Sequence, residues 1–120
     1  GTYVLTKRFT SKEERRRLVA VVYEPEVVDS EYVGFENHLN YFHENGRGLP
    51  KALARGLALF LNSRAVDEFF RQFSGHTQVN ATDIRNMRFP DRATLERLGA
   101  LAERGWPDQR EIDAAVEALL

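Results

Sequence analysis

The chain has 120 residues, 42% of them hydrophobic, with 4 Pro and 8 Gly, and this length fits one compact domain with a single hydrophobic core. It contains no cysteine, which excludes disulfides and thiolate metal sites and gives no sign of an oxidising compartment. No apolar stretch approaches the roughly 18 residues of a membrane span, and no signal-peptide pattern is present, so we expect a cytoplasmic protein without a membrane partner.

The formal net charge of −1 hides an asymmetry between two parts of the chain. Residues 45–90 carry seven basic and three acidic side chains, a balance of +4, whereas residues 91–120 carry four basic and seven acidic ones, a balance of −3. Clustered basic side chains favour contact with anions. The sequence therefore predicts that an anion meets the middle of the chain rather than its C-terminal part.

The N-terminal part has the pattern of antiparallel strands. Residues 2–10 (TYVLTKRFT) are rich in β-branched and aromatic side chains, which is typical of a strand. A second strand is predicted over residues 18–23, and the two together predict an antiparallel hairpin. Residues 31–48 (EYVGFENHLNYFHENGRG) predict a third strand because they are again rich in strand-forming side chains.

The apolar spacing changes to a helical period after residue 48. Residues 49–63 (LPKALARGLALFLNS) predict a helix with Pro50 near its first turn, where a missing N–H costs little. Residues 63–73 (SRAVDEFFRQF) predict a second helix with Ser63 as its N-cap. The side chains expected to face inward are Leu53, Leu57, Phe60 and Leu61 in the first helix and Val66, Phe69, Phe70 and Phe73 in the second.

Two more amphipathic helices are predicted over about residues 91–103 and 107–120, with Trp106 and Pro107 as the hinge between them. No repeat and no low-complexity linker interrupts the chain. The sequence therefore predicts one α+β domain over residues 1–120, in which short antiparallel strands precede a helical half.

The segments GLPKALARGLALFLNS (48–63) and FFRQFSGHTQVNATDIRNMRFP (69–90) together resemble the C-terminal target-recognition region of bacterial adenine-specific DNA methyltransferases. They are similar, more distantly, to the recognition domains in specificity subunits of type I restriction enzymes. In these families a helix ending in an LNS-like turn leads through a second helix to a polar segment and an RFP strand. The resemblance covers residues 31–90 and implies a target-recognition-domain-like fold that holds DNA and selects its sequence.

The resemblance also implies a parent enzyme of a restriction-modification system that transfers a methyl group from S-adenosylmethionine to adenine in double-stranded DNA. Such enzymes carry an Asn-Pro-Pro-Tyr-like motif for the flipped base and a glycine-bearing turn for the cofactor, and neither motif occurs in this sequence. We therefore expect this chain to hold no catalytic residue and no cofactor, and to act beside the catalytic domain of the parent chain.

The most polar stretch, SGHTQVNATDIRNMRFP (74–90), has two interpretations. If it is extended, His76, Gln78 and Asn80 share one face, and their amide and imidazole groups suit base edges. Alternatively, Gln78 and Asn80 hold their own loop through local hydrogen bonds. We favour the second role for these two amides, because the family keeps this segment while target sequences differ, and we leave His76 and Thr77 open.

Four basic side chains are predicted to contact DNA phosphates. Arg85 and Arg88 lie close to the polar stretch, and Arg47 and Lys51 lie at or just before a helix N-terminus, where backbone N–H groups also attract phosphate. The alternative for each of them is an ordinary solvated surface charge.

Base readout is predicted instead within residues 36–48 (ENHLNYFHENGRG), where Glu36, His38 and Asn40 alternate on one face of a strand. The spacing of the chain's three histidines matches no compact zinc pattern, so no metal site is predicted.

A function of another class also fits the helical half. Its apolar side chains could dock a partner subunit, which would make the chain a protein-interaction module. A catalytic domain encoded before Thr2 would favour the methyltransferase hypothesis over this one. The side chains considered for docking are Leu53, Leu57, Phe69 and Phe70.

Overall fold

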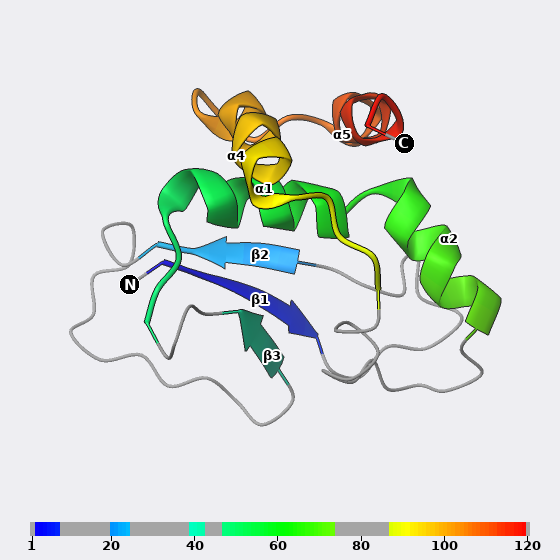
Figure 1. Ribbon diagram of the computed structural model, residues 1–120, viewed down its shortest axis with the longest axis horizontal. Helices are drawn as coiled ribbons and strands as arrows, with labels where there is room; N and C mark the ends of the chain where they lie inside the picture. Colours follow the sequence, from blue (N-terminus) through cyan, green and yellow to red (C-terminus); the bar gives the residue numbers. More distant parts are fainter. Residues whose placement is uncertain (1, 8–19, 25–38, 43–46, 74–86, 120) are drawn as a thin grey trace.

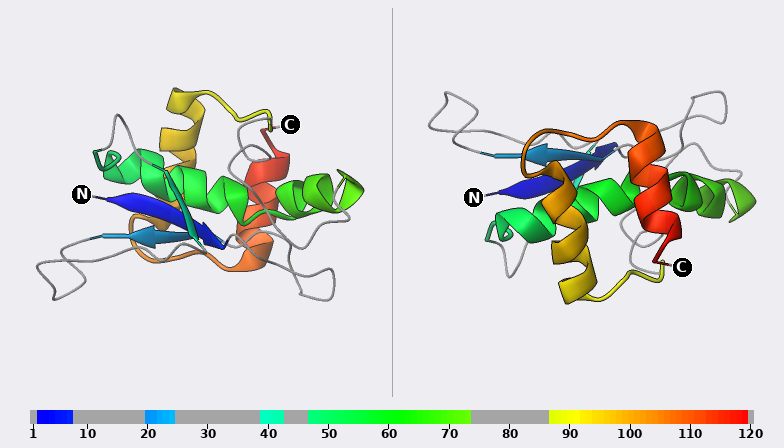
Figure 2. Two further views of the ribbon diagram at one scale, coloured as in Figure 1. Left: turned by 90° about the horizontal axis from the view of Figure 1, so that it is seen from below. Right: turned by 90° about the horizontal axis from the view of Figure 1, so that it is seen from above.

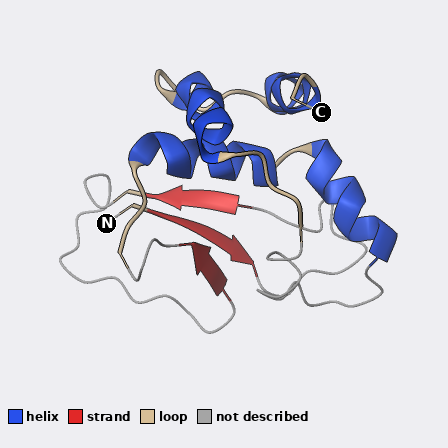
Figure 3. Cartoon of the chain, viewed as in Figure 1, coloured by secondary structure: helices blue, strands red, loops and turns tan. Residues whose placement is uncertain are grey.

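The computed structural model describes residues 2–7, 20–24, 39–42, 47–73 and 87–119. Within them, strands come first and helices follow, so the predicted α+β class is confirmed (Figure 3). The elements are β1 (Tyr3–Lys7), β2 (Ala20–Tyr23), β3 (Leu39–Phe42), α1 (Lys51–Leu61), α2 (Arg64–Phe73), α4 (Arg92–Gly99), the 3-10 helix η1 (Ala100–Ala102) and α5 (Gln109–Glu117).

The strands form one antiparallel sheet in the order β2-β1-β3. Val4 in β1 lies opposite Val22 in β2 and Phe42 in β3. Because side chains alternate along a strand, Val4 and Thr6 share one face of β1, and both are buried. The predicted hairpin is confirmed, and the predicted third strand is confirmed over the residues of β3.

Helix α1 is the central layer of the molecule. It lies along one face of the sheet, and α4 crosses it on the side away from the sheet (Figures 1 and 2). Being covered from two sides explains why residues 57–61 are buried at every position. The inward orientation predicted for Leu57, Phe60 and Leu61 is confirmed, whereas Leu53 is half-buried.

Helices α1 and α4 cross at two buried glycines. A Cβ atom on Gly56 would lie 1.7 Å from the carbonyl oxygen of Leu95, and a Cβ atom on Gly99 would lie 2.1 Å from the carbonyl oxygen of Ala52. Both carbonyl oxygens belong to the backbone, so they cannot move aside as the end of a flexible side chain could. Each glycine is therefore required by the close approach of the two helices.

The helical faces considered for docking pack inside the chain. Leu57 and Phe70 are buried in the core, and Leu53 and Phe69 pack against it. The rings of Phe69 and Phe70 meet edge to face, with their centroids 5.4 Å apart. The chain's own core therefore covers Leu57 and Phe70, whereas Leu53 and Phe69 are only partly covered, and docking through this face stays a prediction.

The two C-terminal helices are shorter than predicted. The helix expected over residues 91–103 ends at Gly99 and continues as η1, and the helix expected over 107–120 begins at Gln109, after Asp108. Within the described residues, every helix is too short or too polar to traverse a lipid bilayer.

Candidate nucleic-acid interface

The N-terminus of α1 is unlike those of α4 and α5. Pro50 is its N-cap, no side chain accepts a hydrogen bond there, and its first turn contains no acidic residue. In α4 and α5, by contrast, Asp91 and Asp108 each accept a backbone N–H of the first turn, at 2.8 and 2.9 Å. The partial positive charge of the α1 N-terminus is therefore not offset by a carboxylate of its own first turn, and Lys51 adds a full charge beside it.

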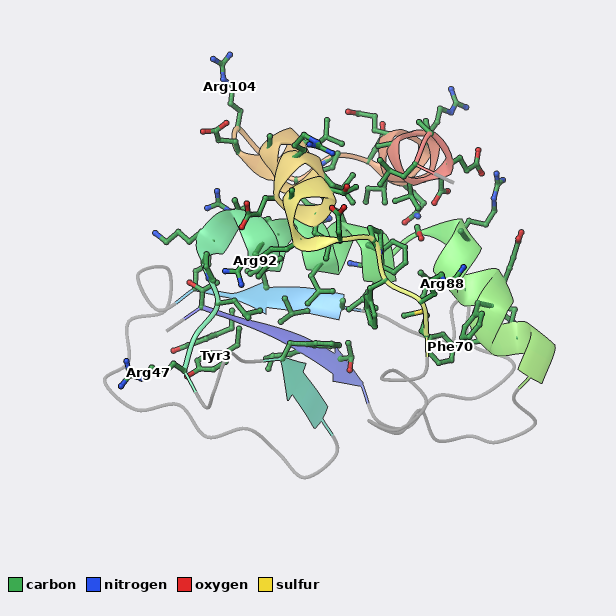
Figure 4. The ribbon with its side chains drawn as sticks, in the orientation of Figure 1. Tyr3, Arg47, Phe70, Arg88, Arg92 and Arg104 are labelled. Carbon is green, nitrogen blue, oxygen red and sulfur yellow. The ribbon has the colours of Figure 1, made fainter. Side chains whose placement is uncertain are left out.

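Arg47 extends this positive end of the molecule. Its side chain is exposed, and it pairs with no acidic residue among those that the structure describes. Two residues later, Leu49 donates its N–H to the carbonyl oxygen of Thr2 at 2.6 Å, which ties the segment to the start of β1. Figure 4 shows Arg47 on the same side of the molecule as Tyr3.

Arg88 lies toward the other end of the long axis of the molecule (Figure 4). It is exposed, and it is flanked by the buried Met87 and by Phe89, whose ring centroid is 5.7 Å from that of Phe60. The two buried or packed neighbours fix the backbone from which Arg88 projects. Since Arg47 and Arg88 are far apart, they do not form one phosphate-binding cluster.

The RFP strand expected from the family resemblance is absent: residues 88–90 form no strand. Phe89 packs against Phe60 of α1 instead of joining the sheet, and Pro90 has no N–H to give to a strand ladder. Residues 88–90 lead directly to the N-cap of α4. The expectation of a strand at these residues was therefore wrong.

Other basic side chains of residues 45–90 are neutralised by acids. In Arg64, the hydrogen bond to the Glu117 carboxylate and the attraction of the same carboxylate raise the pKa of the guanidinium above its ordinary value. The neutralising pairs are Arg55 with Glu24, Arg64 with Glu117, and Arg71 with Asp67. Among the described residues, Arg47 and Arg88 are exposed cationic side chains of this segment outside these three pairs.

The turn between α1 and α2 depends on Asn62, which sequence reasoning did not single out. Asn62 is 7% exposed, its Oδ1 accepts the N–H of Ala20 at 2.8 Å, and its Nδ2 donates to the Ala20 carbonyl at 2.7 Å. Its amide thus pairs with the outer edge of β2 as a neighbouring strand would. The available signal was the LNS turn of the family motif, whose amide therefore has a structural role.

Ser63 completes this turn. Its Oγ donates to the carbonyl of Phe60 at 2.7 Å and accepts the N–H of Val66 at 3.4 Å, so the predicted N-cap of α2 is confirmed. The hydroxyl is buried, and both contacts are to backbone groups at helix ends, the Phe60 carbonyl of α1 and the Val66 N–H of α2.

Helix α5 reinforces the same turn from the C-terminal part of the chain. Asp113 accepts the backbone N–H of Arg64 at 2.8 Å, and Gln109 donates to the carbonyl oxygen of Asn62 at 2.9 Å. Gln109 also donates to Asp113 at 2.9 Å, which orients the carboxylate. Polar groups of α5 and of β2 therefore converge on one short turn.

Of the residues proposed to read bases, to hold the polar loop or to contact phosphate beside it, the structure places Asn40 and Arg88. Asn40 lies in β3, where its backbone is paired with Thr6 of β1. The others, namely Glu36, His38, His76, Thr77, Gln78, Asn80 and Arg85, lie outside the described residues. Their roles remain predictions.

The chain is similar over its whole length to two methyltransferases. It is 49% identical over 120 residues to the type II methyltransferase M.PstI of Providencia stuartii. It is 52% identical over 122 residues to the type II methyltransferase M.BsuBI of Bacillus subtilis. In both comparisons 100% of this chain matches 24% of the relative, so the chain spans about a quarter of the length of these relatives. No family model and no solved structure matches the chain.

Proposed function

We propose that the chain is the DNA target-recognition region of a type II methyltransferase, because the whole chain resembles a quarter of two such enzymes. That likeness is the observation that carries the proposal. The parent enzyme, part of a restriction-modification system, would transfer a methyl group from S-adenosylmethionine to the exocyclic amine of a flipped adenine. This region would hold double-stranded DNA beside the catalytic domain, without catalytic residues of its own.

The proposed phosphate contacts begin at the α1 N-terminus. Arg47 and Lys51 bring cationic side chains to a helix end whose first turn has no acid, and such an end attracts phosphate. Arg88, on another side of the molecule, would contact a separate phosphate, and Arg85 would act near it. These contacts would hold the duplex without reading its sequence.

Base readout in this proposal comes from Glu36, His38 and Asn40, whereas Gln78 and Asn80 hold their loop. The roles of His76 and Thr77 stay open between the two. If Gln78→Ala lowers thermal stability and weakens all duplexes alike, Gln78 has a framework role. A loss confined to one base pair of the target, about 1 to 3 kcal/mol, would instead assign Gln78 to readout.

Salt-dependent binding of a duplex tests the phosphate contacts. Each contact that is removed should reduce the slope of log K against log salt by about 0.9, so we expect this change for at least two of Arg47→Ala, Lys51→Ala, Arg85→Ala and Arg88→Ala. Arg104→Ala is the matched control, because this exposed residue lies on the side of the molecule away from Arg47 (Figure 4). Slopes unchanged in all four variants would make these residues ordinary surface charges.

Two simpler experiments test whether the catalytic and cofactor-binding motifs lie in another part of the same polypeptide. The coding sequence that contains this chain should also encode the Asn-Pro-Pro-Tyr-like and cofactor-binding motifs. Calorimetry of the 120-residue chain with S-adenosylmethionine should give no binding. Micromolar affinity would contradict the proposal that the cofactor binds elsewhere.

A further inference from the structure

A groove of about 390 Å³ lies between β2, α1 and the connection that follows η1. We call it the Trp106 groove. Its lining includes Val22 of β2, Ala102 of η1 and Trp106, and α1 contributes Arg55. None of these residues belongs to the positive end formed by Arg47 and Lys51.

A large apolar side chain lies at this groove without being covered. Trp106 is 50% exposed, although it lines the groove together with the buried Ala102. Tryptophan is enriched where proteins meet, because it buries a large apolar area. The exposure therefore indicates an interaction surface.

The chemistry of the groove favours an apolar protein segment over nucleic acid. Its one cationic lining residue, Arg55, is paired with Glu24 at 2.8 Å, so the groove offers no unpaired cation to a phosphate. Strand addition is also restricted, because the Asn62 amide already occupies the outer edge of β2 at Ala20. The partner must then fit by its side chains rather than as an added strand.

We propose that the Trp106 groove binds the remaining part of the methyltransferase polypeptide, which packs an apolar side chain against Trp106. This inference rests on the proposed function, since the chain matches only 24% of each relative and the other three quarters must meet it somewhere. Neither Arg47 nor Lys51 lines the groove, so the groove can be occupied while Arg47 contacts DNA.

Hydroxyl-radical footprinting read by mass spectrometry tests this docking at single residues. Oxidation of Trp106 is compared in the 120-residue chain and in the full-length polypeptide, both without DNA. We expect Trp106 to be oxidised several-fold more slowly in the full-length polypeptide. Met87, which is buried within the chain, should be protected equally in both and serves as the internal control.

Three results would overturn the proposal. Equal oxidation of Trp106 in both proteins would mean that the groove stays open. Protection that appears only with added duplex would assign the groove to nucleic acid, and protection that rises with the concentration of the 120-residue chain would assign it to a second copy. Failure of the chain to bind duplex, with Trp106 still protected, would refute only the DNA-binding part of the proposed function.

Substitutions in the full-length polypeptide provide a second measurement. Trp106→Ser should speed native-state proteolysis between the two parts several-fold. Leu119→Ser is the matched control, because Leu119 is 43% exposed and lies outside the Trp106 groove. Unchanged cleavage in the Trp106→Ser variant would overturn the proposal. Thermal unfolding of the same variants in the isolated chain shows whether they still fold.

Discussion

Helix α1 is fixed in place by two contacts of opposite kinds. At its crossing with α4, Gly56 and Gly99 remove side chains so that backbone touches backbone. At its C-terminal end, Asn62 adds a buried polar side chain that bonds to the edge of β2. The first contact depends on shape alone, and the second depends on the direction of hydrogen bonds.

The difference shows how a small domain specifies one arrangement of its layers. Close packing at the crossing sets the distance between α1 and α4. The Asn62 amide has both a donor and an acceptor engaged, and it fixes α1 against one residue of β2. Each contact supplies a constraint that the other lacks, which leads to the following predictions.

The largest effect is expected for Gly56→Ala. Helix propensity alone would make this change stabilising by about 1 kcal/mol, but the new Cβ would lie 1.7 Å from the Leu95 carbonyl oxygen. We therefore expect the free energy of unfolding to fall by about 3 kcal/mol or more in urea denaturation. Ala93→Gly, at an exposed position of α4, is the control and should cost only about 1 kcal/mol. A Gly56→Ala variant more stable than the wild type would contradict the claim that the crossing of α1 and α4 requires a glycine at this position.

Asn62→Ala is expected to have the next largest effect. It leaves the buried N–H and carbonyl of Ala20 without partners, and we expect a loss of about 2 to 4 kcal/mol in the free energy of unfolding. Asn62→Asp keeps the acceptor for the N–H but replaces the donor, so it should not recover the loss. Recovery by Asn62→Asp would show that only one of the two hydrogen bonds matters.

A smaller effect of opposite sign is expected for Thr6→Val. Thr6 is 1% exposed, and its Oγ1 has no hydrogen-bond partner, unlike the satisfied amide of Asn62. Removing this hydroxyl while keeping the side-chain shape should leave stability unchanged or raise it by up to about 1 kcal/mol. Val4→Thr, on the same buried face, makes the reverse change and should destabilise the chain. A destabilised Thr6→Val variant would indicate a partner for the hydroxyl.

The smallest effect concerns the exposed N-cap of α4. Hydrogen bonds from the side chain and then the backbone N–H of Thr94 lower the pKa of Asp91 below its ordinary value. Because the folded-state pKa is the lower one, this stabilisation is present above the unfolded pKa of about 4 and is lost as pH falls through the folded value. Thermal melts of the wild type and Asp91→Asn should differ slightly at pH 7 and converge below pH 4. A difference that grows at low pH would contradict this assignment.

Local features of the fold were predictable from the sequence. The strand content of residues 2–10 and 18–23, the helical period after residue 48 and the Ser63 cap all depend on neighbours in sequence, and the structure contains them. The close approach at Gly56 was not predicted, because its partner helix lies about forty residues away in sequence. The role of Asn62 was not predicted for the same reason, because its hydrogen-bond partner Ala20 is 42 residues away in sequence.

The candidate site was predictable in residue type but not in arrangement. Counting charges singled out residues 45–90, yet pairing with Glu24, Glu117 and Asp67 neutralises several of those charges. Glu24 and Glu117 lie outside residues 45–90, so the charge balance of that segment did not include them, whereas it already included Asp67. The Trp106 groove was not predicted either, because Val22 and Trp106 are brought together only by the fold.

The position of Trp106 has an optical consequence. It is the only tryptophan in the chain and is half exposed, so its fluorescence senses water at the groove rather than the interior of the domain. Heating or urea should shift this emission little, and the loss of helix is better followed by circular dichroism. A shift of the emission to shorter wavelength under folding conditions would report that a partner segment has covered Trp106. Fluorescence would then report docking, and circular dichroism would report folding, on the same sample.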